Sequence, residues 1–190
     1  AIQVGTTPSE PSTANPAITF VGQNYDQAST VTGFPLPVFS LATGTLPTGL
    51  TLNTSNGHIT GTPSTAGVYQ FRVRAANWAG TVVTANYSVT VWDKPAISSV
   101  TALSQSINES DSYSEVVVAD SPSTTFSVSS GELPLGLTLN SQTGEISGVA
   151  NTFGTYKFKV SATNPAGSSE SDEITILVKQ APVVSSDVIT

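Results

Sequence analysis

The chain has 190 residues, 13 acidic and 6 basic side chains, a net charge of −7 and a pI near 4.4. This acidic balance argues against nucleic acid or an anionic membrane as a partner. No apolar run approaches the roughly 18 residues that a membrane-spanning helix needs. Without cysteine, the chain offers no thiol for a disulfide, for covalent catalysis or for a metal.

Hydrophobic residues make up 38% of the chain and charged residues only 10%. Much of the remainder is Thr, Ser, Asn, Gly and Pro, a mixture that is poor for helices and suits strands joined by tight turns. The composition therefore predicts an all-β fold.

One stretch of the sequence occurs twice: residues 44–80 return as residues 131–167, displaced by 87 positions without a gap. A period of this length is too long for one supersecondary unit of a solenoid. Each copy can instead bury a modest core of its own, so we expect two globular domains in tandem.

The same offset predicts the domain boundaries. Pro8 lies one period before Pro95, and residues 182–186 (PVVSS) repeat the pattern of residues 95–99 (PAISS). The predicted parts are residues 1–7 as a linker or the end of a preceding repeat, residues 8–94 as repeat 1, residues 95–182 as repeat 2, and residues 183–190 as the start of a further repeat or a linker.

In chain order, the first strands are expected at residues 18–20 and 25–31, where β-branched and aromatic residues gather. Two short strands on either side of a polar turn follow, with Leu50, Leu52 and Ile59 as their inward side chains. Leu50 and Leu52 are two residues apart, so they share one face of a strand.

The next strand alternates between an apolar and a polar face, the pattern of a half-buried strand. Its inward positions are Tyr69, Phe71, Val73 and Ala75 in the first copy, and Tyr156, Phe158, Val160 and Ala162 in the second. Residues 77–80 and 164–167 are hairpin turns by residue type, and another alternating strand follows each turn. The predicted fold is therefore two tandem immunoglobulin-like antiparallel β-sandwich domains.

The spaced positions of this repeat resemble a known family. The pattern GxLPxGLxLNxxxGxIxGxPxxxGxYxFxVxAxNxAG is similar to the bacterial "putative Ig" repeat, a cadherin-like, immunoglobulin-like module. The second copy departs where Gly-Thr-Pro at residues 61–63 becomes Gly-Val-Ala at residues 148–150. The resemblance implies a seven-stranded sandwich in large secreted or cell-surface proteins, where such modules space, extend or present other domains.

The pattern of polar residues does not favour catalysis. The single histidine, His58, stands beside a turn, and Glu145 replaces it in the second copy. A catalytic nucleophile needs a base and an orienting partner, and no Ser–His pair recurs. We expect no catalytic residue and no enzyme, with His58 as a surface side chain.

Calcium is the one cofactor that the resemblance raises, because related cadherin repeats hold Ca²⁺ between modules. Such a site needs about six to eight oxygen ligands, several of them carboxylates. Asn77 and Asn164 stand where the cadherin pattern places an acidic residue. Asp93, Glu109 and Asp111 remain as calcium candidates, and we expect no cofactor and a junction that is independent of calcium.

Trp78 is the candidate ligand-binding residue, because it replaces Pro165 at a hairpin tip and an exposed indole can stack on a sugar. In the alternative interpretation, Trp78 packs along its own turn, while Trp92 shields the junction between the repeats. A ligand site also needs several convergent groups, and one aromatic residue does not provide them.

These features predict a non-catalytic structural or adhesion module, a spacer or stalk segment of a larger bacterial extracellular or cell-surface protein. Its partners would be neighbouring repeats of the same polypeptide, with a surface glycan or protein ligand as a further option. The alternative is a carbohydrate- or protein-binding accessory module of an adhesin or secreted glycoside hydrolase. A fold alone does not decide between them, but a binding site should be present in one copy and absent from its sister.

Overall fold

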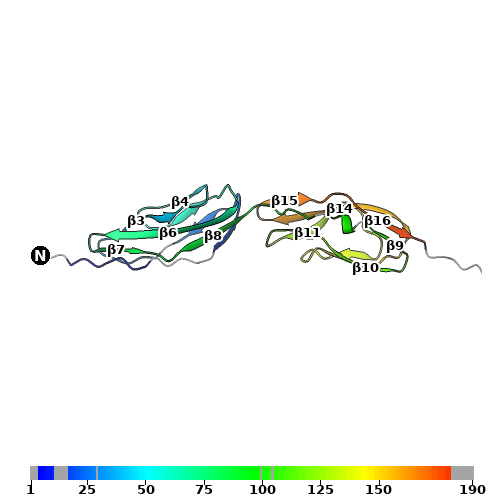
Figure 1. Ribbon diagram of the computed structural model, residues 1–190, viewed down its shortest axis with the longest axis horizontal. Helices are drawn as coiled ribbons and strands as arrows, with labels where there is room; N and C mark the ends of the chain where they lie inside the picture. Colours follow the sequence, from blue (N-terminus) through cyan, green and yellow to red (C-terminus); the bar gives the residue numbers. More distant parts are fainter. Residues whose placement is uncertain (1–3, 11–16, 29, 99, 104, 181–190) are drawn as a thin grey trace, which may run out of the picture. The chain divides into compact units, whose positions relative to one another are not determined.

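The computed structural model describes residues 4–10, 17–28, 30–98, 100–103 and 105–180. The chain divides into two compact units, Ala1–Asp93 and Lys94–Thr190, which we call unit one and unit two (Figure 1). The predicted start of a further repeat at residues 183–190 lies outside the described residues.

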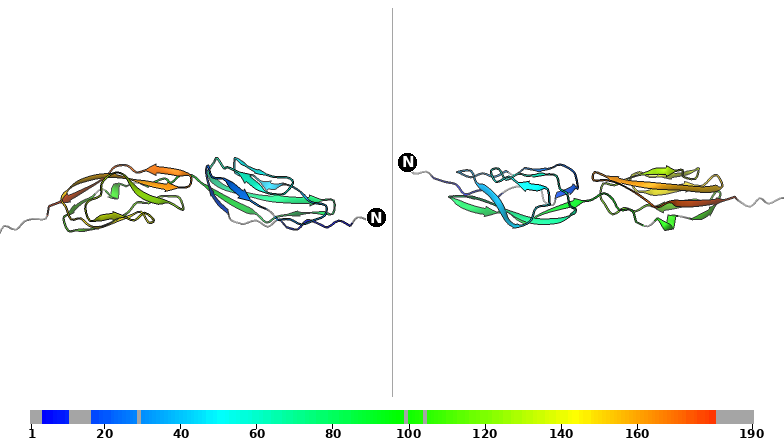
Figure 2. Two further views of the ribbon diagram at one scale, coloured as in Figure 1. Left: turned by 180° about the vertical axis from the view of Figure 1, so that it is seen from behind. Right: turned by 90° about the horizontal axis from the view of Figure 1, so that it is seen from above.

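Unit one is built from short strands that form two layers. The strands are β1 (Ala17–Phe20), β2 (Tyr25–Gln27), β3 (Val38–Gly44), β4 (Leu50–Leu52), β5 (Ile59–Gly61), β6 (Gly67–Asn77), β7 (Gly80–Val83) and β8 (Tyr87–Trp92). One sheet has the order β1-β8-β6-β3, with β7 also paired to β6, and the other has the order β2-β5-β4. The two sheets pack face to face as a β-sandwich, which can be followed from two sides in Figure 2.

The core of unit one lies between these sheets and confirms the predicted alternation. Along β6, Phe71 and Val73 are buried, whereas Arg72 on the opposite face is exposed. Leu52 and Tyr69 are partly buried against the same core. The buried members are Phe39, Leu50, Ile59, Phe71, Val73, Ala75, Tyr87, Val89 and Val91.

Unit two repeats this architecture. Its elements are β9 (Ser106–Asn108), β10 (Ser112–Val116), β11 (Thr125–Gly131), β12 (Leu137–Leu139), β13 (Glu145–Val149), β14 (Gly154–Asn164), β15 (Gly167–Glu170) and β16 (Ile174–Lys179), with a short 3₁₀ helix η1 (Thr101–Leu103) before β9. The sheet orders are β11-β14-β16-β9, with β15 on β14, and β10-β13-β12. The two units therefore share one topology.

The registers of the two units explain why the sequence repeat is clear only from β3 onward. β3 and β11, β6 and β14, and β8 and β16 begin and end 87 residues apart. Before β3 the offset is 88, because Tyr25 pairs with Gly61 whereas Tyr113 pairs with Gly148. Relative to unit one, unit two has one residue fewer between its second and third strands.

Three details differ from the expected strands. Each unit has eight strands among its described residues, where the family resemblance implied seven. The first strand runs parallel to the last, β1 beside β8 and β9 beside β16. The second strand ends at Gln27, which pairs with Ile59 at the start of β5, whereas we predicted residue 31.

The N-terminal residues that the structure describes pack on unit one. Thr6 and Phe34 exchange two backbone hydrogen bonds of 2.9 and 3.2 Å, and the Ser9 N–H donates to the carbonyl of Thr32 at 2.9 Å. Whether residues 1–7 act as a linker or end a preceding repeat stays a prediction.

Candidate functional site

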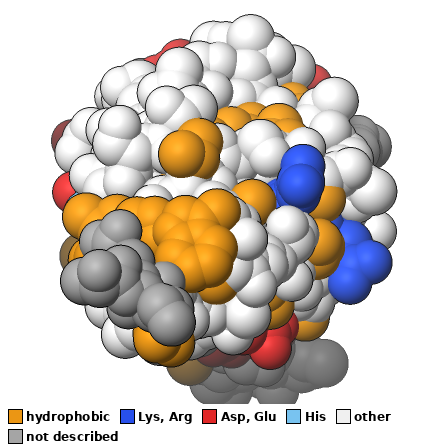
Figure 3. Space-filling model, turned by 90° about the vertical axis from the view of Figure 1, so that its left-hand side faces the viewer, with side chains coloured by type: hydrophobic (Ala, Val, Ile, Leu, Met, Phe, Trp, Pro, Cys, Tyr) orange, Lys and Arg blue, Asp and Glu red, His pale blue; other side chains and the backbone are white. Residues whose placement is uncertain are grey.

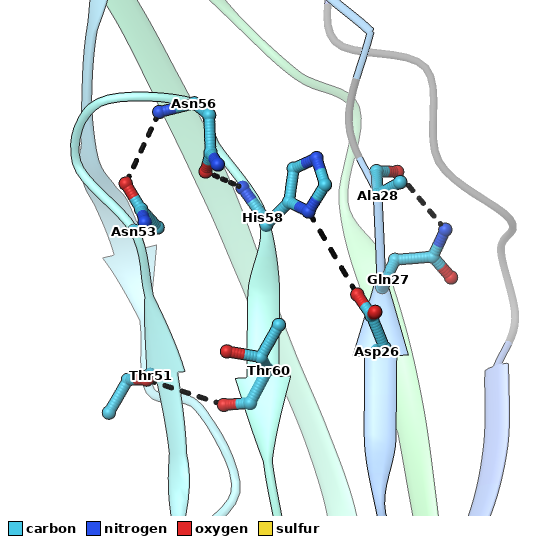
Figure 4. A network of polar contacts seen from close by, with 8 residues as sticks. All are labelled: Asp26, Gln27, Ala28, Thr51, Asn53, Asn56, His58 and Thr60. Atoms are coloured by element: carbon cyan, nitrogen blue, oxygen red, sulfur yellow. Dashed lines mark hydrogen bonds and ion pairs between the residues drawn. The ribbon is translucent and has the colours of Figure 1, made fainter.

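A polar turn between the fourth and fifth strands is held identically in both units. In unit one, Asn53 Oδ1 accepts hydrogen bonds from the N–H groups of Ser55 (2.9 Å) and Asn56 (3.3 Å). The Asn53 N–H donates to the carbonyl of His58 at 2.8 Å. These are local bonds of the kind that asparagine side chains make in turns. They fix the positions of Asn56 and His58 (Figure 4).

The same turn in unit two uses Asn140. Its Oδ1 accepts from the N–H groups of Gln142 (2.9 Å) and Thr143 (3.2 Å), and its N–H donates to the carbonyl of Glu145 at 2.7 Å. A glycine completes each turn. In unit one, Gly57 has φ +74°, and a Cβ there would lie 2.6 Å from the Phe39 ring, so the position needs glycine for both reasons.

His58 interacts across the second and fifth strands with Asp26. Its Nδ1 lies 3.9 Å from Asp26 Oδ1, and its side chain is 37% exposed (Figure 4). In unit two, the corresponding pair is Ser114 and Glu145, whose hydroxyl and carboxylate are 3.0 Å apart. The two pairs occupy the same register, so the side chains at both positions have changed together while the contact between the strands is kept.

This turn forms one wall of a pocket in unit one with a volume of about 360 Å³. The second wall is the segment that leads into β3. The lining residues are Thr30, Val31, Thr32, Leu36, Pro37, Phe39, Ser55, Asn56 and His58. Four apolar side chains thus lie in the same pocket as three hydroxyls, an amide and an imidazole.

A corresponding pocket of about 430 Å³ lies at the same place in unit two. It is lined by Val116, Val117, Val118, Ala119, Ser121, Ser123, Thr124, Phe126, Gln142 and Thr143. Phe39 and Phe126 form the same part of each pocket because they begin the buried face of β3 and β11. The pocket is therefore a property of the fold, whereas its chemical lining differs between the units.

The pocket of unit one lacks the arrangement of a nucleophile with its base. Among the described residues, no serine or threonine hydroxyl bonds to the His58 imidazole, and Asp26 lies beyond hydrogen-bond distance from it. An orienting carboxylate and a polarised hydroxyl are the minimum for such catalysis.

Trp78 lies at the β6–β7 turn of unit one, as predicted, and is 63% exposed. One side of its ring rests on the backbone of Gly5, where an added Cβ would overlap the indole. The ring is therefore supported by the N-terminal segment, and much of its surface still faces solvent. The contact with Gly5 was not foreseen.

Asn77 holds the surroundings of Trp78 in place. Its Nδ2 donates to the carbonyls of Thr6 (2.8 Å) and Pro35 (2.9 Å), and its Oδ1 accepts from the N–H groups of Ala79 and Gly80. In unit two, Asn164 is buried, and its Nδ2 donates to Ser121 Oγ at 2.7 Å. Both asparagines are thus anchors of the hairpin, a role that the repeated Asn-x-Ala-Gly pattern could have indicated.

The same end of unit one exposes further apolar side chains that unit two lacks. The four residues before β3 are FPLP, with Phe34 49% and Leu36 79% exposed, whereas the four before β11 are SPST. Figure 3 shows apolar side chains gathered on this end of unit one. A binding site is expected in one unit and not in its sister, and these exposed apolar side chains differ between the units in this way.

The calcium candidates lie in different elements. Asp93 follows the last strand of unit one, whereas Glu109 and Asp111 lie in a turn of unit two. Asp111 Oδ2 accepts from the N–H and Nδ2 of Asn108 at 2.8 and 2.9 Å, so its carboxylate stabilises its own turn. Within the described ranges, no group of three or more His, Cys, Asp or Glu side chains could hold a metal ion.

Two further polar positions were missed from the sequence. Thr84 is fully buried, and its Oγ1 accepts from the Val73 N–H at 2.9 Å. Ser171, 87 residues later, accepts from the Val160 N–H at 3.0 Å in the same way. A hydroxyl residue recurs at these two positions, 87 residues apart, and this recurrence could have indicated their role in the fold.

Two tyrosines of the second strands have raised pKa values. Burial, and to a smaller degree the neighbouring Glu115 carboxylate, raises the pKa of Tyr113 well above its usual range. The Tyr113 hydroxyl donates to the carbonyl of Leu103 at 2.8 Å. Burial also raises the pKa of Tyr25, its counterpart in unit one.

Fold and repeat together define a tandem array of immunoglobulin-like β-sandwiches. The family described as "Putative Ig domain" matches residues 2–92 and 94–179, and the chain belongs to this family. No curated protein matches the sequence. No helix within the described residues is long and apolar enough to cross a membrane.

Several solved structures are similar to this chain at low sequence identity. The I-band fragment I67–I69 of titin is 17% identical, with a TM-score of 0.56 over 95% of this chain and 67% of that one. Extracellular domains 3–6 of protocadherin gamma B2 are 13% identical, with a TM-score of 0.44 over 90% of this chain and 53% of that one. An endo-fucoidan hydrolase of glycoside hydrolase family 107 is 20% identical, with a TM-score of 0.42 over 91% of this chain and 34% of that one.

Proposed function

We propose that the chain is a force-bearing spacer, a non-catalytic structural segment of a larger extracellular or cell-surface protein. The observation that carries this proposal is the pairing of first and last strands within each unit. In unit one, β1 lies parallel to β8, with the register running from Ala17 opposite Val89 to Phe20 opposite Trp92. In unit two, β9 lies parallel to β16 over three residue pairs.

This pairing suits a segment that carries tension. A pull on the two ends of a unit draws the first and last strands in opposite directions along their common axis. The evenly spaced bonds of a parallel pair are then loaded together in shear, and they do not open one after another. The repeated skeleton of apolar positions and turn-locking asparagines supports the same role, because the outward side chains differ between the copies.

Single-molecule pulling on the 190-residue chain tests the proposal. We expect two discrete unfolding events, each releasing a chain of about 3.3–3.6 Å per residue over the 87-residue period. Resistance to force depends on the rate of unfolding. Each unfolding event should therefore appear as a force peak well above the baseline of the pulling trace. Extension without discrete events would contradict a load-bearing role.

A binding function is the second candidate, as a carbohydrate- or protein-binding accessory module. The specific observation that favours it is the exposure of Trp78, Phe34 and Leu36 in unit one, where unit two has Pro165, Ser121 and Ser123. Loss of glycan or protein binding in Trp78→Ala, with both units still folded, is the expected result. Unchanged binding in this variant would remove Trp78 from the site.

A further inference from the structure

The pocket of unit one combines an apolar wall with a polar wall. Val31, Leu36, Pro37 and Phe39 provide the apolar side chains. The polar wall contains Ser55, Asn56 and His58 on the turn between β4 and β5, with the hydroxyl residues Thr30 and Thr32 on the opposite segment. A volume of about 360 Å³ lies within the range of small-ligand sites, about 300–1,000 Å³.

The lining of this pocket is free of lysine, arginine, aspartate and glutamate. A phosphate, sulfate or carboxylate group would find no lysine or arginine there, and the nearby Asp26 would repel it. A divalent cation would find too few oxygen ligands, since calcium takes about six to eight. The lining therefore matches a neutral ligand that has both hydrogen-bonding groups and apolar surface.

Polar groups that remain free to bind a ligand are already fixed in position. Asn56 uses its Oδ1 to accept from the His58 N–H at 3.0 Å, and its Nδ2 makes no hydrogen bond to another described residue. The His58 ring is oriented through Nδ1 toward Asp26, and in the part of the chain that the structure describes its Nε2 has no partner. Donors held by a rigid turn bind with a smaller entropic cost.

We propose that this pocket binds one neutral sugar residue of a glycan. A sugar ring has hydroxyls around its edge and C–H groups on its faces, which fit the polar wall and the apolar wall of the pocket. Asn56 and His58 bond to the hydroxyls, and Leu36 and Pro37 cover the apolar face. Asn77, the neighbour of Trp78 in the chain, donates a hydrogen bond to the carbonyl of Pro35, the neighbour of Leu36. Trp78 therefore lies at the same end of unit one and stacks on a further part of the glycan. This role goes beyond the spacer function and does not depend on it.

Unit two supplies substitutions that the fold already accepts. Asn56→Thr introduces the residue that unit two carries at Thr143, and the double variant Asp26→Ser/His58→Glu reproduces the pair Ser114–Glu145. Both should leave the melting temperature of unit one close to that of the unchanged chain. The matched control is Thr143→Asn in unit two, which changes the corresponding pocket and leaves that of unit one intact.

The test is binding of the full chain to a glycan array with oligosaccharides ending in glucose, galactose, mannose or N-acetylglucosamine, beside sialylated and sulfated forms. The strongest neutral binder is then titrated by calorimetry. We expect millimolar or tighter binding of a neutral glycan, at least a tenfold loss in Asn56→Thr and in the double variant, and no change in Thr143→Asn.

Three outcomes would overturn the inference. The first is no neutral glycan bound at millimolar concentration. The second is preferred binding of sulfated or sialylated glycans, or of peptides offered on a parallel array. The third is neutral-glycan binding lost in Trp78→Ala but kept in both pocket variants, which leaves a binding function at the hairpin and removes it from the pocket. The pulling experiment decides the spacer function separately.

Discussion

Asn53 and Asn140 hold the same turn in the two units, so they provide a matched pair of substitutions. Asn53→Ala removes the acceptor of two backbone N–H groups, and we expect a loss of about 1 kcal/mol in the free energy of unfolding of unit one. For a domain of this size that lowers the melting temperature by about 4–8 °C. Asn140→Ala should have the same effect on unit two.

Asn53→Asp is the control, because a carboxylate keeps the acceptor. Hydrogen exchange, which reports each unit separately, should show Asn53→Asp close to the unchanged chain. Equal losses in Asn53→Ala and Asn53→Asp would show that the side-chain acceptor is not what holds the turn.

Tyr113 gives a second prediction at the level of one side chain. Because its pKa is raised by burial, the folded state keeps the phenol proton at pH values where the unfolded chain, with a pKa of about 10, loses it. The stabilisation is complete below pH about 10 and is lost as the pH rises above it. Unit two should therefore lose at most about 1.4 kcal/mol per pH unit in that range from this group.

Tyr113→Phe should remove the contribution of this group to the loss of unfolding free energy above pH about 10. It also removes the hydrogen bond to Leu103 and so lowers stability at neutral pH. The slope of unfolding free energy between pH 10 and 11 is the measurement. An alkaline slope that is unchanged in Tyr113→Phe would contradict the assignment.

Among the structural elements, the end of β7 depends on a buried hydroxyl. Thr84→Val keeps the shape of the side chain and removes the acceptor of the buried Val73 N–H. An unsatisfied buried N–H costs about 1–3 kcal/mol, and we expect that loss in chemical denaturation of unit one. Thr84→Ser keeps the hydroxyl, as Ser171 does in unit two, and should lose less. The same loss in both variants would contradict the role of the hydroxyl.

The strands differ in how much of them could be predicted from the sequence. β6 and β14 were predicted well, because the alternation from Tyr69 to Ala75 and from Tyr156 to Ala162 indicates both the strand and its buried face. The parallel pairing of β1 with β8 could not be predicted, since these strands are far apart in the chain and β1 is only four residues long. The offset of 88 residues before β3 also hid the correspondence between Tyr25 and Tyr113.

The candidate site was predicted only in part. The exposure of Trp78 follows from its place in a hairpin turn. The pocket could not be predicted, because it lies between Leu36 and His58, which neither share a strand nor show a common periodicity. Its recurrence in unit two becomes visible only when the registers are compared.

At the scale of the whole molecule, we predict that folding does not depend on calcium. The described carboxylates form no cluster of metal ligands, and Asp111 is engaged by Asn108. Adding millimolar Ca²⁺ to metal-stripped protein should leave the melting temperatures of both units within about 1 °C, because a ligand stabilises only the state that binds it. A rise of many degrees would contradict this prediction.

The central claim is that the parallel pair of first and last strands carries the load in each unit. The Val21 N–H donates to the Trp92 carbonyl at 2.9 Å, and alternation along the strand places the Thr19 N–H on the same side, facing β8. The Ile18 N–H faces away from β8. Proline lacks an N–H, so Thr19→Pro removes a bond of the ladder, whereas Ile18→Pro and Thr19→Val keep it.

Single-molecule pulling of the unchanged chain and these three variants tests this claim most directly, with unit two as the internal reference. We predict that Thr19→Pro lowers the unfolding force of unit one, that Ile18→Pro and Thr19→Val leave it nearly unchanged, and that the event from unit two is the same throughout. An unfolding force of unit one that is equal in all four proteins would contradict a load-bearing β1–β8 pair.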